Sequence, residues 1–207
     1  CGGGEVNSLA RNVVAVFDRL LPVGCALHEP EFAGNEWLYV KECLDTGWVS
    51  TVGKFVDRFE GMLADITGSA HTVATVNGTA ALHTCLMLAG VRPGDEVVMP
   101  ALTFVATANA AAYCGAVPHF ADVEEHSLGL DAAKLDQHLH DGCARDGNGL
   151  RNRATGRRIA AVVCMHTFGH PCDLDALVEV CARHGVPLIE DAAESLGSLY
   201  KGRHTGL

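Results

Sequence analysis

Residues 186–195 read VPLIEDAAES: a short apolar segment leads directly into three carboxylates that stand among small residues. The apolar residues predict a buried strand that ends at the acids. Ligands bind at the carboxyl ends of strands in open α/β sheets, and a carboxylate buried there needs a partner that offsets its removal from water. Acids also stabilise helix N-termini, so this segment alone fits either a ligand site or a helix start.

Strand-like and helix-like segments alternate through the sequence before this point. The expected strands are residues 71–76, 96–99, 116–121, 159–165 and 186–190, and the expected helices between them are residues 78–89, 103–113, 131–140 and 173–184. This alternation predicts a mainly parallel sheet covered by helices on both faces. Residues 142–158 are poor in apolar side chains and predict a long loop or a hairpin insertion. We therefore expect a doubly wound α/β domain over residues 54–207.

Residues 1–53 predict a helical arm and a loop in front of that domain. Apolar side chains recur at helical spacing over residues 9–21. A second helix is expected to start at Asn35, as its N-cap, and to stop at Gly47. A third helix, residues 54–66, would then open the α/β domain.

The composition restricts the partners of the chain. The formal charge is −10, with 15 lysines and arginines in 207 residues, which argues against a nucleic-acid partner. No apolar run reaches the roughly 18 residues that a membrane-spanning helix needs, so no membrane partner is expected. The sequence starts at Cys1 without a signal-peptide pattern. We expect a cytoplasmic location and a sequence that is not a complete gene product.

Nine cysteines, an odd number without any Cys-x-x-Cys pair, predict reduced thiols rather than a disulfide framework. Cys85, Cys114 and Cys164 lie in apolar runs and are expected to be buried. Residues 166–172 (HTFGHPC) contain two histidines and a cysteine, but glycine and proline interrupt them and no second pair of ligands exists. No metal site is therefore expected.

Candidate ligand groups follow several of the expected strands. Gly78 and Thr79 stand at a strand-to-helix corner, where free amides at a helix start and a hydroxyl group can hold a phosphate; a plain helix cap is the alternative. Phe104 could stack on a flat ligand or pack into the core. The sequence contains neither a Walker loop nor a Gly-x-Gly-x-x-Gly pattern, so the usual support for a nucleoside triphosphate or NAD is missing.

Together these groups match the needs of pyridoxal 5′-phosphate (PLP). Its phosphate requires amides and hydroxyls, its ring face an aromatic side chain, and its pyridine nitrogen a carboxylate. An ionised Asp191 would favour the protonated nitrogen, which makes the ring an electron sink. Glu194 could reach the ring hydroxyl or face solvent. The expected cofactor is therefore PLP.

Several stretches resemble the DegT/DnrJ/EryC1/StrS family. They are NGTAAL (77–82), PGDEV (93–97), TFVATANA (103–110) and EDAAE (190–194). Others resemble the branch of that family that acts in legionaminic acid and related sugar pathways. They are HEP (28–30), GNE (34–36), GWVSTVGKFV (47–56) and MHTFGHP (165–171). The resemblance covers nearly the whole chain in order.

The resemblance implies a fold, an activity and roles for single residues. The family consists of PLP-dependent aminotransferases of nucleotide-linked keto sugars with the aspartate aminotransferase (type I) fold. By this resemblance Gly78 and Thr79 bind the cofactor phosphate, Phe104 stacks on the ring, Asp191 pairs with the pyridine nitrogen and Glu194 lies near the ring hydroxyl. It also implies an amino-acid donor such as glutamate, a homodimer, and a place in bacterial surface-polysaccharide sugar biosynthesis.

The catalytic lysine of the family is missing. In the family, the lysine that forms a Schiff base with the cofactor follows the acidic motif by a further strand and loop. The lysines of this sequence do not match that place; they are Lys41, Lys54, Lys134 and Lys201. We therefore expect a large domain truncated at Leu207, no C-terminal small domain, and a segment that is inactive alone. A sugar dehydratase of the same family and a non-catalytic sugar-nucleotide- or partner-binding fragment are the alternatives.

Overall fold

The computed structural model describes residues 3–21, 24, 30–147 and 149–207. His28 and Glu29, which contributed to the resemblance, lie outside these residues. The chain forms two compact units, residues 1–50 and 51–207, and each is described by itself.

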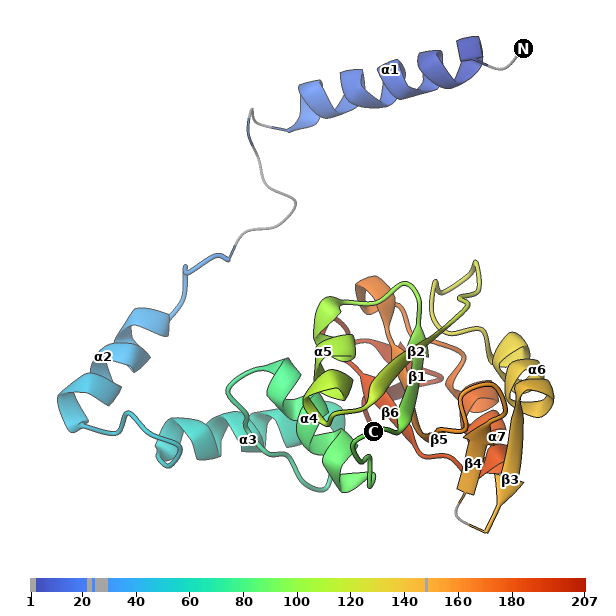
Figure 1. Ribbon diagram of the computed structural model, residues 1–207. Helices are drawn as coiled ribbons and strands as arrows, with labels where there is room; N and C mark the ends of the chain where they lie inside the picture. The colour runs from blue at the N-terminus through green and yellow to red at the C-terminus, as the bar shows by residue number, and fades with distance from the viewer. Residues whose placement is uncertain (1–2, 22–23, 25–29, 148) are drawn as a thin grey trace. The chain divides into compact units, whose positions relative to one another are not determined.

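The described residues of the first unit form the helices α1 (Gly3–Leu20) and α2 (Glu36–Thr46) (Figure 1). The predicted first helix is confirmed and begins earlier than expected. Gly47 ends α2 in the left-handed conformation (φ 74°), as predicted, and its amide donates to the carbonyl of Leu44. Asn35 stands at the N-cap position of α2, as predicted, but it is not extended (φ −97°, ψ 11°) and its side chain makes no cap hydrogen bond.

The second unit is built on a mixed, mostly parallel sheet. Its parallel strands are β1 (Glu96–Pro100), β2 (Val117–Ala121), β5 (Arg158–Met165) and β6 (Leu188–Asp191). The strand order is β2-β1-β5-β4-β3, and β6 also pairs with β5. The register aligns Val98 of β1 with Val162 of β5, and Met165 of β5 with Asp191 of β6. The α/β class predicted from the sequence is confirmed.

The segment that was expected as a loop or a hairpin insertion is a hairpin. Its strands β3 (Cys143–Asp146) and β4 (Gly149–Asn152) pair antiparallel. Leu150 and Arg151 of β4 continue the sheet by pairing with the first residues of β5. The hairpin is thus an antiparallel extension of the parallel sheet.

The strand expected at residues 71–76 is absent, since residues 71–75 have no regular structure. Two of their hydrogen bonds go to α3 (Lys54–Thr67) and none goes to a neighbouring strand. The Glu60 carboxylate accepts from the amide of Ala74 (2.7 Å), and the hydroxyl of Thr72 donates to the Glu60 carbonyl (2.6 Å). Val73 is 80% exposed, so its apolar character does not reflect core packing.

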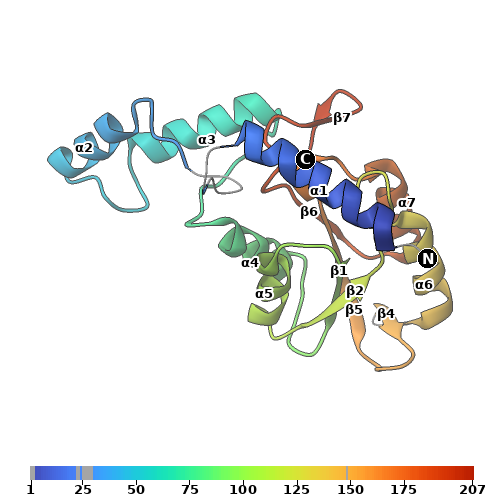
Figure 2. The same cartoon turned by 90° about the horizontal axis from the view of Figure 1, so that it is seen from above.

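Helices cover both faces of the sheet, as predicted. Figure 2 shows α4 (Gly78–Leu88) and α5 (Val105–Tyr113) on one side of the strands, and α6 (Ala132–Gly142) and α7 (Leu174–His184) on the other. Successive β1 residues alternate between the two resulting cores: Val97 and Met99 belong to the one under α4 and α5, and Val98 to the one under α6 and α7. The domain is therefore doubly wound.

The helix starts follow from side-chain caps. Asn77, Asp131 and Asp173 accept from the amides of Ala80, Lys134 and Ala176, respectively. Helix α5 begins two residues later than expected because Phe104 is extended (φ −74°, ψ 146°). Among the cysteines expected to be buried, Cys114 and Cys164 are buried, but Cys85 is exposed on α4.

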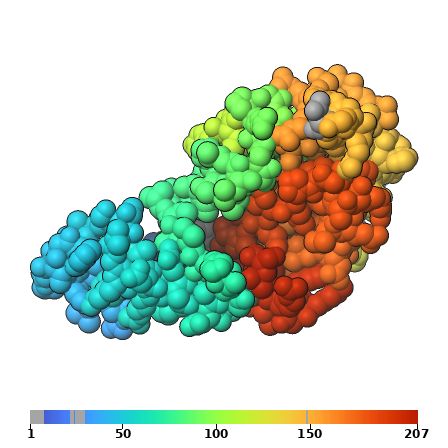
Figure 3. Space-filling model, turned by 90° about the horizontal axis from the view of Figure 1, so that it is seen from below, coloured from blue at the N-terminus to red at the C-terminus, as the bar shows by residue number. Residues whose placement is uncertain are grey.

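The C-terminal residues form a small hairpin. Strands β7 (Leu199–Tyr200) and β8 (Arg203–His204) pair antiparallel, and Lys201 in the turn has a positive φ of 50°. Figure 3 shows α3 beside these residues, and α3 contacts β8. No helix within the described ranges is long and apolar enough to cross a membrane.

Candidate functional site

The candidate site lies where the parallel strands end. Because Met165 and Asp191 are register partners, the carboxyl ends of β5 and β6 lie side by side. The segment after β1 reaches the same place, since both the Thr103 hydroxyl and the Phe104 amide lie 3.2 Å from the Met165 sulfur. The residues after β1 and the last residues of β5 and β6 thus meet at the carboxyl ends of the strands, where ligands of open α/β sheets bind.

Asp191 is a buried carboxylate held by neutral donors. Only 6% of the residue is exposed. Its Oδ2 accepts from the hydroxyl of Thr107 at 2.6 Å, and its Oδ1 accepts from the amide of Ala193 at 3.3 Å. These bonds fix the carboxylate without neutralising its charge, so the position favours a cationic ligand group. The sequence alone therefore predicted an acid at a strand end correctly, and the helix-start interpretation does not apply to this residue.

Thr107 was not predicted as a site residue. It is 1% exposed and lies on α5, within the stretch TFVATANA that was quoted only for its resemblance. A threonine facing inward from a helix of alanines is a usable signal, because a buried hydroxyl needs a hydrogen-bond partner. The sequence does not say that this partner is Asp191.

Phe104 lies at the candidate site and not in the core. It precedes α5, and 62% of the residue is exposed. The interpretation as a core aromatic is therefore wrong. Its amide contact with Met165 places the backbone of Phe104 beside the strand that pairs with Asp191, and its ring is free to contact a ligand. Stacking on a ring stays a prediction.

Gly78 and Thr79 form the first turn of α4. Asn77 caps this helix with its side-chain oxygen 2.9 Å from the amide of Ala80. The first amides of a helix have no acceptor within the helix, and those of Gly78 and Thr79 fall in this group. A Cβ at Gly78 would meet nothing within 4 Å, so the approach to these amides is open. Helix α4 contacts both α5 and β6, so it lies on the same face of the sheet as α5.

Glu194 is engaged with the loop that follows β5. Its Oε2 accepts from the amide of Phe168 at 2.8 Å. Phe168 lies in the short 3₁₀ turn Thr167–Gly169, has a left-handed backbone (φ 53°, ψ 26°) and is 79% exposed. Left-handed conformations of bulky residues occur mostly where the surroundings impose them. Glu194 is thus a backbone acceptor here, and its proximity to a ring hydroxyl stays a prediction.

A hydrogen-bond network lies next to the site, around the residue before Asp191. His166 Nε2 lies 2.9 Å from Glu190 Oε2, and the amide of Cys172 donates to His166 Nδ1 at 3.2 Å. Glu190 Oε2 also accepts from the amide of Gly206 at 2.8 Å. Burial raises the pKa of Glu190, but the bonds from His166 and the Gly206 amide outweigh it and lower the pKa. The network ties β6 to the C-terminal residues.

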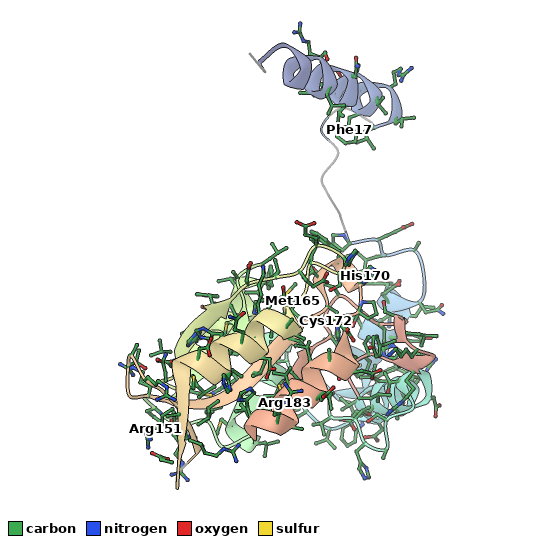
Figure 4. The ribbon with its side chains drawn as sticks, turned by 90° about the vertical axis from the view of Figure 1, so that its right-hand side faces the viewer. Phe17, Arg151, Met165, His170, Cys172 and Arg183 are labelled. Atoms are coloured by element: carbon green, nitrogen blue, oxygen red, sulfur yellow. The ribbon has the colours of Figure 1, made fainter. Side chains whose placement is uncertain are left out.

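The histidines and cysteine of residues 166–172 do not gather around a cation. Both ring nitrogens of His166 already have protein partners. The Cys172 thiol lies 3.1 Å from the carbonyl of Met165, and Figure 4 shows these two residues side by side. Within the described part of the chain, no group of three or more His, Cys, Asp or Glu side chains is arranged to hold a metal ion.

Comparisons with known proteins agree on one family. The model of the DegT/DnrJ/EryC1/StrS aminotransferase family matches residues 30–207. GDP-perosamine synthase of Caulobacter vibrioides is 42% identical over 177 residues, which are 86% of this chain and 43% of that protein. The chain thus spans less than half the length of this curated relative.

Solved structures show the same fold. The crystal structure of DesI in the presence of its TDP-sugar product superposes with a TM-score of 0.69 at 34% identity, over 84% of this chain and 41% of that one. The PLP form of Spr1654 from Streptococcus pneumoniae superposes with a TM-score of 0.72 at 25% identity, over 87% of this chain and 46% of that one. The aspartate aminotransferase-type fold expected from the resemblance is confirmed for the part that the chain covers.

Proposed function

The chain belongs to the DegT/DnrJ/EryC1/StrS aminotransferase family, and on this premise we propose that its protein moves an amino group from an amino acid to a nucleotide-linked keto sugar with PLP as cofactor. Glutamate is the proposed donor. The names of the relatives support the substrate class, because GDP-perosamine synthase and DesI with its TDP-sugar product both refer to nucleotide-linked sugars. The legionaminic acid branch stays a prediction.

One observation carries the proposal: the buried Asp191 carboxylate at the end of β6, fixed by Thr107 and the Ala193 amide. A cationic heterocycle nitrogen satisfies the remaining need of such a carboxylate, because opposite charge offsets desolvation. The protonated pyridine nitrogen of PLP is such a group. The residues of the site therefore fit the cofactor.

In the other proposed contacts, neighbouring elements hold different parts of the cofactor. The amides and hydroxyl of Gly78 and Thr79, at the start of α4, would hold the phosphate through the helix N-terminus. The exposed phenyl ring of Phe104 would cover a ring face. When bound, PLP supplies an electron sink that makes the proton on the amine-bearing carbon of the substrate acidic. Asp191 contributes by holding a proton on the pyridine nitrogen, and Thr107 contributes by orienting Asp191.

We further propose that the lysine that reacts with the cofactor aldehyde lies outside residues 1–207, and that this segment alone does not transaminate. The contacts of the lysines support this view. Lys41, Lys134 and Lys201 pair with Asp45, Asp122 and Asp175, respectively. Lys54 lies over the ring of Phe55. Lys41, Lys54 and Lys134 are remote from Asp191 in the chain, Lys201 follows it more closely, and all four are engaged with other groups.

The proposed setting is a homodimer in the cytoplasm. The homodimer follows from the family resemblance, and the exposed Phe168 beside the candidate site is compatible with a partner surface there. The cysteines within the described ranges are all free thiols, which fits a reducing compartment. Purification of the protein followed by light scattering tests the oligomeric part of this proposal.

The test of the function is the Asp191→Asn variant of the whole protein. Loss of an opposite charge lowers the pKa of a partner by about 1–3 units, and each unit corresponds to about 1.4 kcal/mol. Transfer of ¹⁵N from glutamate to a GDP- or TDP-linked keto sugar should therefore slow about 10- to 1,000-fold, while PLP still binds by absorbance. Wild-type turnover in this variant would falsify the role of Asp191.

A further inference from the structure

A second cluster of titratable side chains lies away from the candidate site. It comprises Glu96, the first residue of β1, His119 on β2 and His138 on α6. His119 Nδ1 is 2.7 Å from Glu96 Oε2, and His119 Nε2 is 2.9 Å from His138 Nε2. The two imidazole rings thus face each other through one nitrogen each. Because Glu96 starts its strand, the cluster is remote from the strand ends that form the candidate site.

Glu96 is built to remain a carboxylate. It is 3% exposed, and it accepts from Asn152 Nδ2 at 2.9 Å and from the Thr155 hydroxyl at 2.6 Å, in addition to its contact with His119. Burial raises the pKa of Glu96, but these hydrogen bonds outweigh burial and lower the pKa. An ionised carboxylate only accepts, so the Nδ1 of His119 carries the hydrogen. The other ring nitrogen, Nε2, is directed toward His138.

His138 is the member of the cluster that lies nearest to solvent. The residue is exposed, whereas the side chain of His119 is only 15% exposed. Without a metal, one hydrogen lies between the two Nε2 atoms. A metal replaces this hydrogen when the proton of His138 moves to its Nδ1.

The separation of the two nitrogens is set here by a hydrogen bond, and it is also the separation that two ligands of one metal ion can have. Imidazole nitrogens bind transition metals at about 2.0–2.1 Å, so two nitrogens in adjacent positions at a right angle lie about 2.9 Å apart. The observed distance is 2.9 Å. The carboxylate behind His119 also has the place that orienting carboxylates have behind metal-bound histidines. The ligands come from a strand and a helix, so a bound metal would fasten α6 to the edge strand β2.

We propose that His119 and His138 bind one divalent transition-metal ion through their Nε2 atoms, with Glu96 as the positioning residue and water as the remaining ligands. The adjacent right-angle arrangement of nitrogen and oxygen ligands favours ions of tetragonal or octahedral preference such as Ni²⁺ and Cu²⁺. Ni²⁺ is the suitable probe because it does not oxidise the cysteines.

The experiment measures Ni²⁺ binding to the purified chain by isothermal titration calorimetry, after alkylation of accessible thiols. His138→Ala is the main variant, because the position is exposed and alanine suits a helix. His140→Ala on the same helix is the matched control, since His140 is also exposed and takes no part in the cluster. We expect one Ni²⁺ site that weakens at least tenfold in His138→Ala and in His119→Ala, and about 10- to 100-fold in Glu96→Gln, while His140→Ala binds as the wild type.

A stability readout separates a built site from loose surface binding. A ligand that binds only the folded chain raises its stability, so saturating Ni²⁺ should raise the melting temperature of the wild type and of His140→Ala, and not that of His138→Ala. Equal binding in the wild type and His138→Ala overturns the proposal. Equal losses in His138→Ala and His140→Ala overturn it as well, because they would show general histidine binding.

Discussion

The hydrogen bond between Thr107 and Asp191 is the contact that most directly tests the architecture of the site. The Thr107→Val variant removes the hydroxyl while keeping the shape of the side chain. The bond is 2.6 Å long, and the two residues are 1% and 6% exposed. A hydrogen bond to a charged group contributes about 1.5–3 kcal/mol. Solvent does not screen this pair, so we expect Thr107→Val to lower the free energy of unfolding by this amount.

Two further variants separate the hydroxyl from the packing. Thr107→Ser keeps the hydroxyl and loses one methyl group, which costs about 1 kcal/mol. Thr103→Val is the control, because the single hydrogen of the Thr103 hydroxyl is donated either to the Met165 sulfur or to the Thr107 hydroxyl, both neutral acceptors. We expect a loss below about 1 kcal/mol. The expected order of stability therefore places Thr107→Ser above Thr107→Val, which is the reverse of what side-chain volume alone predicts.

The assay is urea unfolding of the chain at neutral pH, followed by far-ultraviolet circular dichroism. Tryptophan fluorescence is unsuitable, because Trp37 and Trp48 are the two tryptophans of the sequence and both belong to the unit of residues 1–50. A Thr107→Val variant within about 0.5 kcal/mol of the wild type, or one more stable than Thr107→Ser, would refute the assigned bond.

Two other contacts give predictions that need no cofactor. The pKa of Glu96 is lowered on folding from an ordinary value of 4.5, so its contribution to stability is present above that pH and is lost as the pH falls below it. Urea unfolding at several pH values across pH 3–6 should show a drop in the free energy of unfolding toward low pH, and Glu96→Gln should make this drop smaller. An equal dependence of the free energy of unfolding on pH in the variant would contradict this. Glu194 accepts from the amide of Phe168, so Glu194→Ala should speed hydrogen exchange at that amide while Glu194→Gln, which keeps an acceptor, should not; unchanged exchange in both would show that the bond does not form in solution.

The strands of the α/β domain were predictable where apolar runs coincide with burial. All residues of β1 are buried, and residues 159–165 of β5 are buried as well, which is why both were recognised. Residues 71–76 have the same apolar character but end on the surface, because the side chain and carbonyl of Glu60 take up the polar groups of Thr72 and Ala74. An apolar run therefore does not indicate a strand by itself, because contacts with a neighbouring helix are not visible in a local stretch.

The candidate site shows the same limit. Asp191 was predictable, since an acid directly after an apolar run is a local pattern. Thr107 was not, because its partner lies 84 residues away. The contact between Phe104 and Met165 spans 61 residues, and its sulfur acceptor has no recognisable sequence signal. Local patterns identify single ligand groups, whereas the residues that orient them depend on the register of the sheet.

The alanines around Thr107 explain why this register produces a site. Ala110 and Ala111 are fully buried between α5 and the sheet, and α5 also packs against α4. Larger side chains at these positions would move α5 away from the strands, since interiors are close-packed. A shift of one ångström would stretch the 2.6 Å bond from Thr107 to Asp191 beyond hydrogen-bond length. The small residues of the stretch TFVATANA and its single buried hydroxyl are thus parts of one requirement: α5 must lie close enough to β6 for Thr107 to hold the carboxylate in place.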